Sequence, residues 1–262
     1  MEVDRRMVLA AGLAAGASPA LAALAAAAPK LGLIFPVADT PVSPEAKAMY
    51  PTGIDFIPHS LGLKELTPEG YDTVVDKIAP AAKQLADQGA QAITLMGTSL
   101  SFYKGAAFNR ELTRAMTKAS GLKAVTMSTA VVEGLRTMGG RRLAVATAYN
   151  DVVNERLRTF LTEEGFEVLS VKGLNVVKVE DINNVTQAGL LEFSAKVFED
   201  TPKADALLVS CGGLRTLELL DPLEKRCKAP VVSSLPHAFW AGVRLVGKSG
   251  RSPGFGSLLA RA

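Results

Sequence analysis

A cysteine at the end of an apolar, strand-like run is the residue best placed to do chemistry in this sequence. Cys211 follows the run 206–210 and precedes Gly212 and Gly213, where the next helical stretch begins. A thiol in such a place faces a ligand, and the amide N–H groups after it point toward the same ligand. Cys211 is therefore a candidate reactive thiol. The alternative is a buried cysteine that fills the core as a small apolar residue.

Two further strand ends supply hydroxyl groups without any charge. Thr98 and Ser99 follow Gly97 after one apolar run, and Tyr149 follows another. Each of these residues could instead form a helix cap or a turn. Together with the glycine amides, however, they form a set of hydrogen-bond donors that suits an anionic ligand or a developing oxyanion.

The sequence gives no support to metal, dinucleotide or nucleic-acid chemistry. The sequence has two histidines, His59 and His237, and two cysteines, Cys211 and Cys227. Their spacing is not that of a zinc or haem site, so we expect no metal. A disulfide between Cys211 and Cys227 is a weaker alternative. No G-x-G-x-x-G motif follows a strand, which argues against a dinucleotide cofactor. The 29 basic and 26 acidic residues are spread along the chain, so we expect no nucleic-acid partner.

His237 lies close in sequence to Ser233 and Ser234, a combination that could suggest a hydrolase. No G-x-S-x-G elbow accompanies these residues, and partners so near in sequence are uninformative. We therefore expect His237 to be a surface or capping histidine.

The elements that must position these groups follow the pattern of an α/β protein with mostly parallel strands. The chain has 262 residues, 48% of them hydrophobic, which is enough to bury a core. Apolar runs rich in β-branched residues alternate with stretches of helical period. We expect strands at 31–35, 92–96, 124–126, 143–147, 167–171, 206–210 and 231–233. We expect helices at 68–88, 111–119, 130–137, 152–164, 187–198 and 238–246.

A faint internal repeat organises these elements into two halves. The run 92–100 resembles 206–214, and 123–128 resembles 228–234. Two similar α/β halves would place two strand-end loops opposite each other, and ligands bind beyond the carboxyl ends of strands in such folds. We predict two pseudo-symmetric domains, each a mostly parallel sheet flanked by helices, with the active site in the cleft between them. The first domain takes 29–128 and 234–262, and the second takes 129–233.

The first 28 residues have the features of a twin-arginine export signal. Arg5 and Arg6 precede an uncharged, alanine-rich run from Met7 to Pro29. The alternatives are an alanine-rich surface helix and a true membrane anchor. We expect a periplasmic mature protein without a stable membrane anchor after cleavage. The protein would be cytoplasmic if this segment is not a functional signal.

Several long motifs, in order along the chain, resemble the arylmalonate decarboxylase family of the aspartate/glutamate racemase superfamily. They are 67–72, 95–103, 105–109, 126–130, 146–149, 154–157 and 210–214. The resemblance covers about 31–255. It implies two pseudo-symmetric α/β domains, no cofactor, and decarboxylation of 2-aryl malonates to 2-arylcarboxylates through an enediolate.

The resemblance also implies a role for each candidate residue. Thr98, Ser99 and Tyr149, with the amides of Ser99 and Gly212, would bind the retained carboxylate in a dioxyanion hole. Cys211 would then protonate the carbanion, which requires a neutral thiol with a pKa near or above its ordinary value. The other residues expected to bind the small carboxylate substrate are Pro36, Leu63, Leu66, Tyr71, Gly97, Val179 and Ile182.

Racemases and maleate isomerases of this superfamily carry a cysteine at both strand ends, whereas this chain has Gly97 at the first. A single thiol delivers a proton from one face only, which favours decarboxylation with stereospecific protonation. Two alternatives remain open: an isomerase or racemase of a small dicarboxylate or amino acid, and a periplasmic carboxylate-binding protein without turnover. The sequence predicts no oligomeric state.

Overall fold

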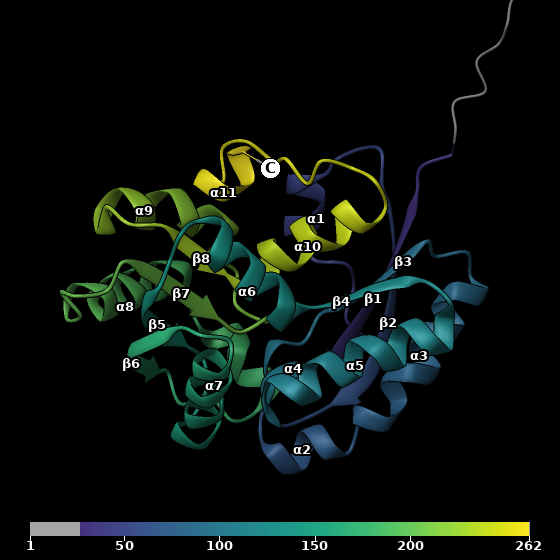
Figure 1. Ribbon diagram of the computed structural model, residues 1–262, viewed down its shortest axis with the longest axis horizontal. Helices are drawn as coiled ribbons and strands as arrows, with labels where there is room; N and C mark the ends of the chain where they lie inside the picture. Colours follow the sequence, from purple (N-terminus) through teal and green to yellow (C-terminus); the bar gives the residue numbers. More distant parts are fainter. Residues whose placement is uncertain (1–26, 262) are drawn as a thin grey trace, which may run out of the picture.

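Two four-stranded parallel sheets form the framework of the computed structural model, which describes residues 27–261 (Figure 1). The first sheet has the order β2-β1-β3-β4 and the second the order β6-β5-β7-β8, so the same topology occurs twice. The strands are β1 (Lys30–Val37), β2 (Asp55–Leu63), β3 (Ala92–Leu95), β4 (Lys123–Thr126), β5 (Arg142–Thr147), β6 (Glu167–Gly173), β7 (Ala206–Ser210) and β8 (Val231–Ser233). This repetition is the two-half α/β architecture that the sequence predicts.

Helices cover both sheets, which explains why the central strands are continuous apolar runs. The α-helices are α1 (Pro44–Met49), α2 (Pro68–Asp72), α3 (Ile78–Asp87), α4 (Thr98–Phe102), α5 (Gly105–Ser120), α6 (Met127–Thr137), α7 (Asp151–Glu163), α8 (Gln187–Glu199), α9 (Leu220–Cys227), α10 (Ser234–Leu245) and α11 (Ser257–Arg261). Three short 3-10 helices add η1 (Val75–Lys77), η2 (Val179–Asn184) and η3 (Leu217–Leu219). Every residue of β3 and of β7 is buried. No helix among residues 27–261 is long and apolar enough to cross a membrane.

Several elements differ from the sequence prediction, among them the short helices α1, α4, α9 and α11, which were not expected. The edge strand β2 was not expected, because Pro58 and the half-exposed residues around it break the apolar pattern. Proline is tolerated at the edge of a sheet, where one row of N–H groups needs no partner. The single helix expected at 68–88 is instead divided into α2, η1 and α3.

The helices α6 and α10 cross between the two halves. Helix α6 leaves β4 of the first sheet and packs against β8, while α10 leaves β8 and packs against β3 and β4. The approach is close, since a Cβ added at Gly134 of α6 would lie 3.3 Å from Val232 Cγ1 and from His237 Cδ2. This exchange holds the carboxyl ends of the two sheets opposite each other.

The C-terminal segment contacts both halves. The Tyr50 hydroxyl donates to the carbonyl oxygen of Gly250 at 2.7 Å, whereas the Ser257 amide donates to Glu224 of α9 at 2.8 Å. Helix α10 packs against β3 and β4 of the first sheet, while α11 lies beside α9 of the other half. The predicted export segment, 1–28, falls outside the described residues apart from its last two.

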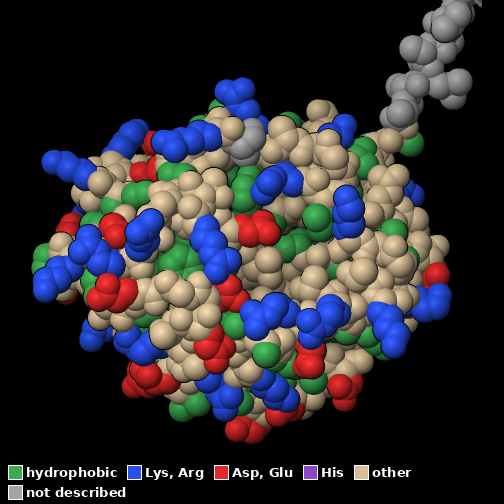
Figure 2. Space-filling model, viewed as in Figure 1, with side chains coloured by type: hydrophobic (Ala, Val, Ile, Leu, Met, Phe, Trp, Pro, Cys, Tyr) green, Lys and Arg blue, Asp and Glu red, His purple; other side chains and the backbone are tan. Residues whose placement is uncertain are grey.

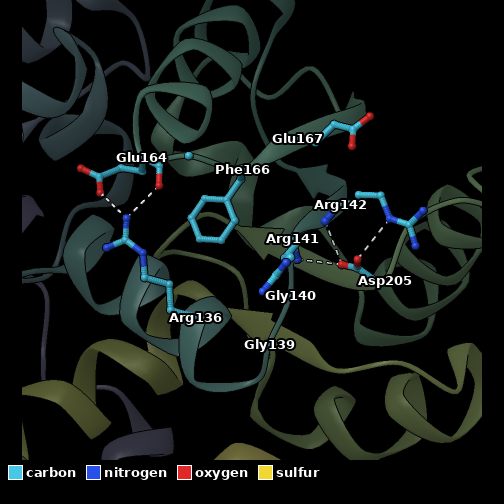
Figure 3. Close-up of a pocket in the computed structure, with 10 residues that line it drawn as sticks. Arg136, Gly139, Gly140, Arg141, Arg142, Glu164, Phe166, Glu167 and Asp205 are labelled. Carbon is cyan, nitrogen blue, oxygen red and sulfur yellow. Dashed lines mark hydrogen bonds and ion pairs between the residues drawn. The ribbon is translucent and has the colours of Figure 1, made fainter.

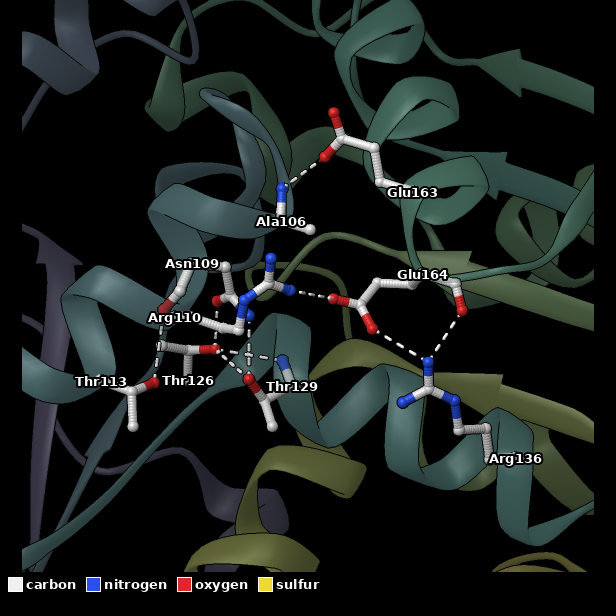
Figure 4. Close-up of polar contacts among 9 residues, drawn as sticks. All are labelled: Ala106, Asn109, Arg110, Thr113, Thr126, Thr129, Arg136, Glu163 and Glu164. Atoms are coloured by element: carbon white, nitrogen blue, oxygen red, sulfur yellow. Dashed lines mark hydrogen bonds and ion pairs between the residues drawn. The ribbon is translucent and has the colours of Figure 1, made fainter.

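Polar contacts at the end of α7 join the halves on a second side (Figure 4). A Glu163 carboxylate oxygen accepts the Ala106 amide N–H of α5 at 2.6 Å. The neighbouring Glu164 pairs with Arg110 at 3.2 Å and with Arg136 at 2.9 Å. Both arginine side chains are more than half exposed, so each ion pair adds little stability. Over the face shown in Figure 2, basic and acidic side chains are interspersed.

Candidate active site

The ends of β3 and β7 meet across the boundary between the two halves. A Cβ added at Gly212, after β7, would lie 3.2 Å from the carbonyl oxygen of Met96, after β3. The same Cβ would lie 3.0 Å from Met127 Sδ, and the Thr98 hydroxyl donates to that sulfur at 2.8 Å. Glycine is required here because the two loops approach so closely. The structure thus brings Thr98 and Gly212 together, as the internal repeat predicts.

Cys211 is held at this junction in an apolar environment. Its side chain is 4% exposed, and its amide N–H donates to Ser234 Oγ at 3.2 Å. Burial raises the pKa of the thiol, and nearby amides of Gly213 and Leu214 and the phenol of Tyr149 only partly oppose this rise. A raised pKa keeps the thiol neutral at pH 7, the state that a proton donor needs.

Three buried hydroxyl groups near this junction have no hydrogen-bond partner among the described residues. They belong to Tyr71, Tyr149 and Ser210. Burial raises the pKa of Tyr149 well above its ordinary value, as do Cys211 and Tyr71, while Ser210 and Ser99 act in the opposite direction. Burial also raises the pKa of Tyr71, against the effect of Ser99. All these groups therefore remain protonated donors around one point.

Unpaired buried hydroxyls are unusual, because each is destabilising by roughly 1–3 kcal/mol unless it finds a partner. A carboxylate has two oxygens with about four acceptor sites between them. A carboxylate bound at this point would give several donors a partner at once.

The backbone of Tyr149 is fixed by a polar network behind it. Its amide N–H donates to Thr147 Oγ1 at 3.1 Å, and the Thr147 hydroxyl donates to Asn154 Oδ1 at 2.7 Å. Asn154 Nδ2 lies 3.4 Å from the Tyr149 carbonyl oxygen. The ring itself packs edge-on against Phe102, with centroids 5.8 Å apart. Tyr149 is therefore held rigidly from both its backbone and its ring.

The predicted apolar residues come from both halves of the molecule. Pro36, Leu63 and Leu66 are buried in the first half. The segment 64–66 meets 177–179 of the second half, where the Val179 amide donates to the Lys64 carbonyl oxygen at 3.1 Å. Ile182 lies against the loop that follows Cys211, because a Cβ added at Gly213 would be 2.9 Å from Ile182 Cδ1.

Gly97 follows β3 and is the N-cap residue of α4. A Cβ added at this position would lie 2.5 Å from Pro36 Cγ, so any side chain there must displace the proline ring. The close approach of Gly97 and Pro36 closes this side of the site. Ser99, directly after it, is 6% exposed.

The expectation of a surface position for His237 is wrong. The residue is 1% exposed and lies in α10, where its Nδ1 is 2.7 Å from the carbonyl oxygen and 3.1 Å from the amide nitrogen of Ser233. Burial lowers its pKa to about 4, so the ring is neutral at pH 7. The contact with Ser233 does fit a capping role, since Ser233 is the N-cap residue of α10.

A broad depression lies at the end of the second sheet where its strands begin (Figure 3), whereas Cys211 follows the carboxyl end of β7. It has a volume of about 820 Å³ and is lined where β5 and β6 begin, with Arg136, Arg142 and Asp205 around it. Arg142 pairs with Asp205 at 3.2 Å, and Arg136 with Glu164. Ligands of parallel α/β sheets bind beyond the carboxyl ends of the strands, so the buried junction is the better candidate.

Sequence reasoning missed two residues that shape the site. In the sequence, Met127 has the features of an ordinary core residue. Only the packing of α6 between the two halves places its sulfur beside Thr98 and Gly212. Ser234, which accepts the Cys211 N–H, reads as a helix cap. Within residues 27–261, no group of three or more histidine, cysteine, aspartate or glutamate side chains could hold a metal ion.

Comparison with known proteins gives one consistent family. The arylmalonate decarboxylase family profile matches residues 31–259. The chain is 47% identical over 234 residues to a Bordetella bronchiseptica protein named arylmalonate decarboxylase. The aligned region covers 89% of this chain and 97% of that relative. It is 23% identical over 240 residues to a Nocardia farcinica maleate isomerase, covering 88% of this chain and 95% of that relative.

Solved structures agree with this relationship. A liganded arylmalonate decarboxylase mutant, with one glycine changed to cysteine and one cysteine to serine, superposes with a TM-score of 0.87 at 46% identity, covering 89% of this chain and all of the other. A Nocardia farcinica maleate cis-trans isomerase bound to TRIS reaches a TM-score of 0.83 at 21% identity, covering 89% of this chain and 98% of the other, and so shares the fold. The chain belongs to the arylmalonate decarboxylase family.

Proposed function

We propose that this protein decarboxylates 2-aryl and 2-aryl-2-alkyl malonates to 2-arylcarboxylates without a cofactor. The observation that supports this most directly is the group of buried, uncharged hydroxyls around the buried thiol of Cys211. Such a site binds one carboxylate through hydrogen bonds while it keeps the proton donor neutral. The relationship to a protein named arylmalonate decarboxylase supplies the substrate class.

The reaction begins with the retained carboxylate in a dioxyanion hole. Ser99 and Tyr149 donate through their side chains, and the amides of Ser99 and Gly212 donate from the two strand ends. Thr98 joins them when its hydroxyl turns from Met127 Sδ to the carboxylate. When the bond to the departing carboxylate breaks, carbon dioxide leaves and the electron pair moves onto the retained group as an enediolate. One well-placed donor contributes about 2.7–4 kcal/mol to such a transition state.

The departing carboxylate occupies the apolar side of the site, lined by Leu63, Leu66, Val179 and Ile182. Loss of its charge is favoured there, because an unsolvated anion is unstable in an apolar environment. Cys211 Sγ then gives its proton to the α-carbon of the enediolate and becomes a thiolate. Water returns a proton to the sulfur and completes the cycle.

The test is carbon dioxide release from phenylmalonate and 2-methyl-2-phenylmalonate by the purified protein, with and without a chelator. The expected result is chelator-resistant turnover that Cys211→Ala abolishes. Maleate is assayed in parallel, since isomerisation of maleate without decarboxylation would favour the dicarboxylate isomerase. Ligand binding that survives Cys211→Ala, with no turnover of any substrate by the wild type, would favour the carboxylate-binding protein.

We further propose that Arg5 and Arg6 direct export of the folded protein through the twin-arginine route. The uncharged, alanine-rich run after them supports this proposal. The expected result is that Arg5→Lys together with Arg6→Lys leaves the protein in the cytoplasmic fraction, whereas the wild type enters the periplasm in a shorter form. Equal distribution of both proteins would contradict this proposal.

A further inference from the structure

The loop that carries Cys211 is held at both of its ends. In this loop, residues 211–216, the Cys211 amide donates to Ser234 Oγ at 3.2 Å and the Thr216 hydroxyl donates to Ser233 Oγ at 3.0 Å. Between these ends lie Gly212 and Gly213, which allow the backbone many conformations. The position of the thiol therefore depends on how firmly the ends of the loop are fixed.

Glu45 fixes the second end from the opposite half of the molecule. This residue lies in α1 and is 8% exposed. Its Oε1 accepts the amide N–H of Thr216 at 2.8 Å and that of Leu217 at 3.1 Å. These amides begin η3, where the first N–H groups of a helix have no partner within it. One carboxylate oxygen thus satisfies two N–H groups 171 and 172 residues away in the chain.

The surroundings of Glu45 show how closely it is tied to this loop. Burial raises the pKa of its carboxyl group, whereas the amides of Leu217 and Thr216 and the charge of Arg215 lower it, and Glu218 raises it. The other carboxylate oxygen has no partner among the described residues. Both bonds to the loop therefore depend on Oε1 alone.

We propose that Glu45 is a positioning residue for Cys211, which anchors residues 211–216 so that the thiol addresses one face of the substrate. This inference rests on the proposed role of Cys211 as the proton donor. A loosened loop would displace the thiol and let water protonate the enediolate from either face. The stereochemistry of the product is thus a readout that a purely structural role would not change.

Two substitutions at Glu45 distinguish the effect of its side-chain length from the effect of its negative charge. Glu45→Gln keeps an acceptor oxygen at the same distance and is expected to retain enantiomeric purity, with kcat close to the wild type. Glu45→Asp keeps the charge but shortens the side chain by about 1.5 Å, so it cannot reach both amides. For Glu45→Asp we expect kcat to fall about 10- to 100-fold, as misplacement of a reacting group by about 1 Å does. The product should also lose enantiomeric purity.

A second measurement follows the thiol without any turnover. The rate at which iodoacetamide alkylates Cys211, measured by peptide mass spectrometry, is expected to rise about fivefold in Glu45→Asp, the effect of one lost buried hydrogen bond. Glu224→Ala is the matched control, because Glu224 also accepts two backbone amides, those of Val231 at 3.3 Å and Ser257 at 2.8 Å. This control is expected to lower the Tm while Cys211 alkylation and enantiomeric purity stay at wild-type values.

The alkylation rate of Cys211 in the three variants decides between the outcomes. Faster alkylation of Cys211 in Glu45→Asp, but not in Glu45→Gln or Glu224→Ala, supports the proposal. Wild-type alkylation and enantiomeric purity in folded Glu45→Asp would overturn it, as would the same changes in Glu224→Ala. If the wild type shows no decarboxylation, the proposed function fails, and the alkylation rates still decide whether Glu45 positions Cys211.

Discussion

The thiol of Cys211 and the phenol of Tyr149 are kept neutral by the same physical cause. Both groups are buried, and removal from water raises the pKa of each acid. A neutral thiol can give a proton, and a neutral phenol can donate a hydrogen bond to an anion. Burial thus prepares both groups for a reaction in which negative charge moves from a departing carboxylate onto a retained one.

Tyr149→Phe is expected to impair catalysis without loss of stability. The phenol has no partner among the described residues, so its removal breaks no internal hydrogen bond and the Tm should stay the same or rise. The value of kcat should fall about 10²- to 10³-fold, the usual effect of losing one oxyanion donor. Steady-state kinetics and thermal unfolding check both parts. A lowered Tm with unchanged kcat would mean that the phenol has a structural role.

The pH dependence of kcat should reflect the raised pKa of Cys211. The active form of the thiol is protonated, so activity is present below its pKa and is lost as the pH rises through it. Because burial raises this pKa, kcat should stay level through neutral pH and decline only above roughly 8.5, the ordinary pKa of a thiol. A pH–rate profile measures this directly. A decline below pH 7, or activity that increases as the thiol ionises, would contradict a thiol proton donor.

At the scale of single residues, the sequence indicated which residues lie at the buried junction better than it indicated the residues that contact them. Cys211, Thr98 and Tyr149 could be found because each follows an apolar strand run. Met127 and Glu45 could not, since an apolar residue in a helix and an acidic residue after a proline have ordinary explanations. Their contacts with the site exist only once the two halves have packed together.

At the scale of elements, the close approach of β6 to the loop after β5 positions the phenol of Tyr149. Gly173 ends β6 beside the loop that follows β5, and a Cβ there would clash with the carbonyl oxygen of Tyr149. The same Cβ would lie 2.6 Å from Asn154 Nδ2 and 3.1 Å from Thr147 Oγ1. Glycine at this position therefore permits the network that holds Tyr149.

Gly173→Ala is expected to disturb that network. The added methyl group must displace the loop, which should destabilise the fold by about 1–3 kcal/mol and lower kcat by more than Lys172→Ala does. Lys172 is the exposed neighbour in β6 and serves as the control. Denaturant unfolding and kcat measured on both variants test the prediction. Equal stability and kcat in the two variants would show that the loop adapts to the methyl group.

The alternation of strands and helices was predictable because parallel strands buried on both faces are continuous apolar runs. The seven predicted strands correspond to β1 and β3 through β8. The edge strand β2 was not predicted from the sequence, because Pro58 and its half-exposed neighbours do not form such a run. Short helices such as α4 and α9 escaped for a related reason, since five to eight residues define little periodicity.

At the scale of the whole molecule, two copies of one topology face each other, and helices α6 and α10 exchange between them. The arrangement brings the carboxyl ends of β3 and β7 to one buried junction, with Thr98 on one side and Cys211 on the other. The internal repeat predicted that two strand ends would meet, but the exchange of the helices has no signature in residue periodicity. With one thiol at this junction, we predict protonation from one side.

The enantiomeric purity of 2-phenylpropionate formed from 2-methyl-2-phenylmalonate tests this central claim most directly. Wild-type protein should release carbon dioxide and give one enantiomer, and Cys211→Ala should lose the turnover. Tyr149→Phe should be slower but equally stereospecific, because its thiol is intact. Racemic product from the wild type, or a single enantiomer from an active Cys211→Ala protein, would contradict the assignment of Cys211 as the proton donor.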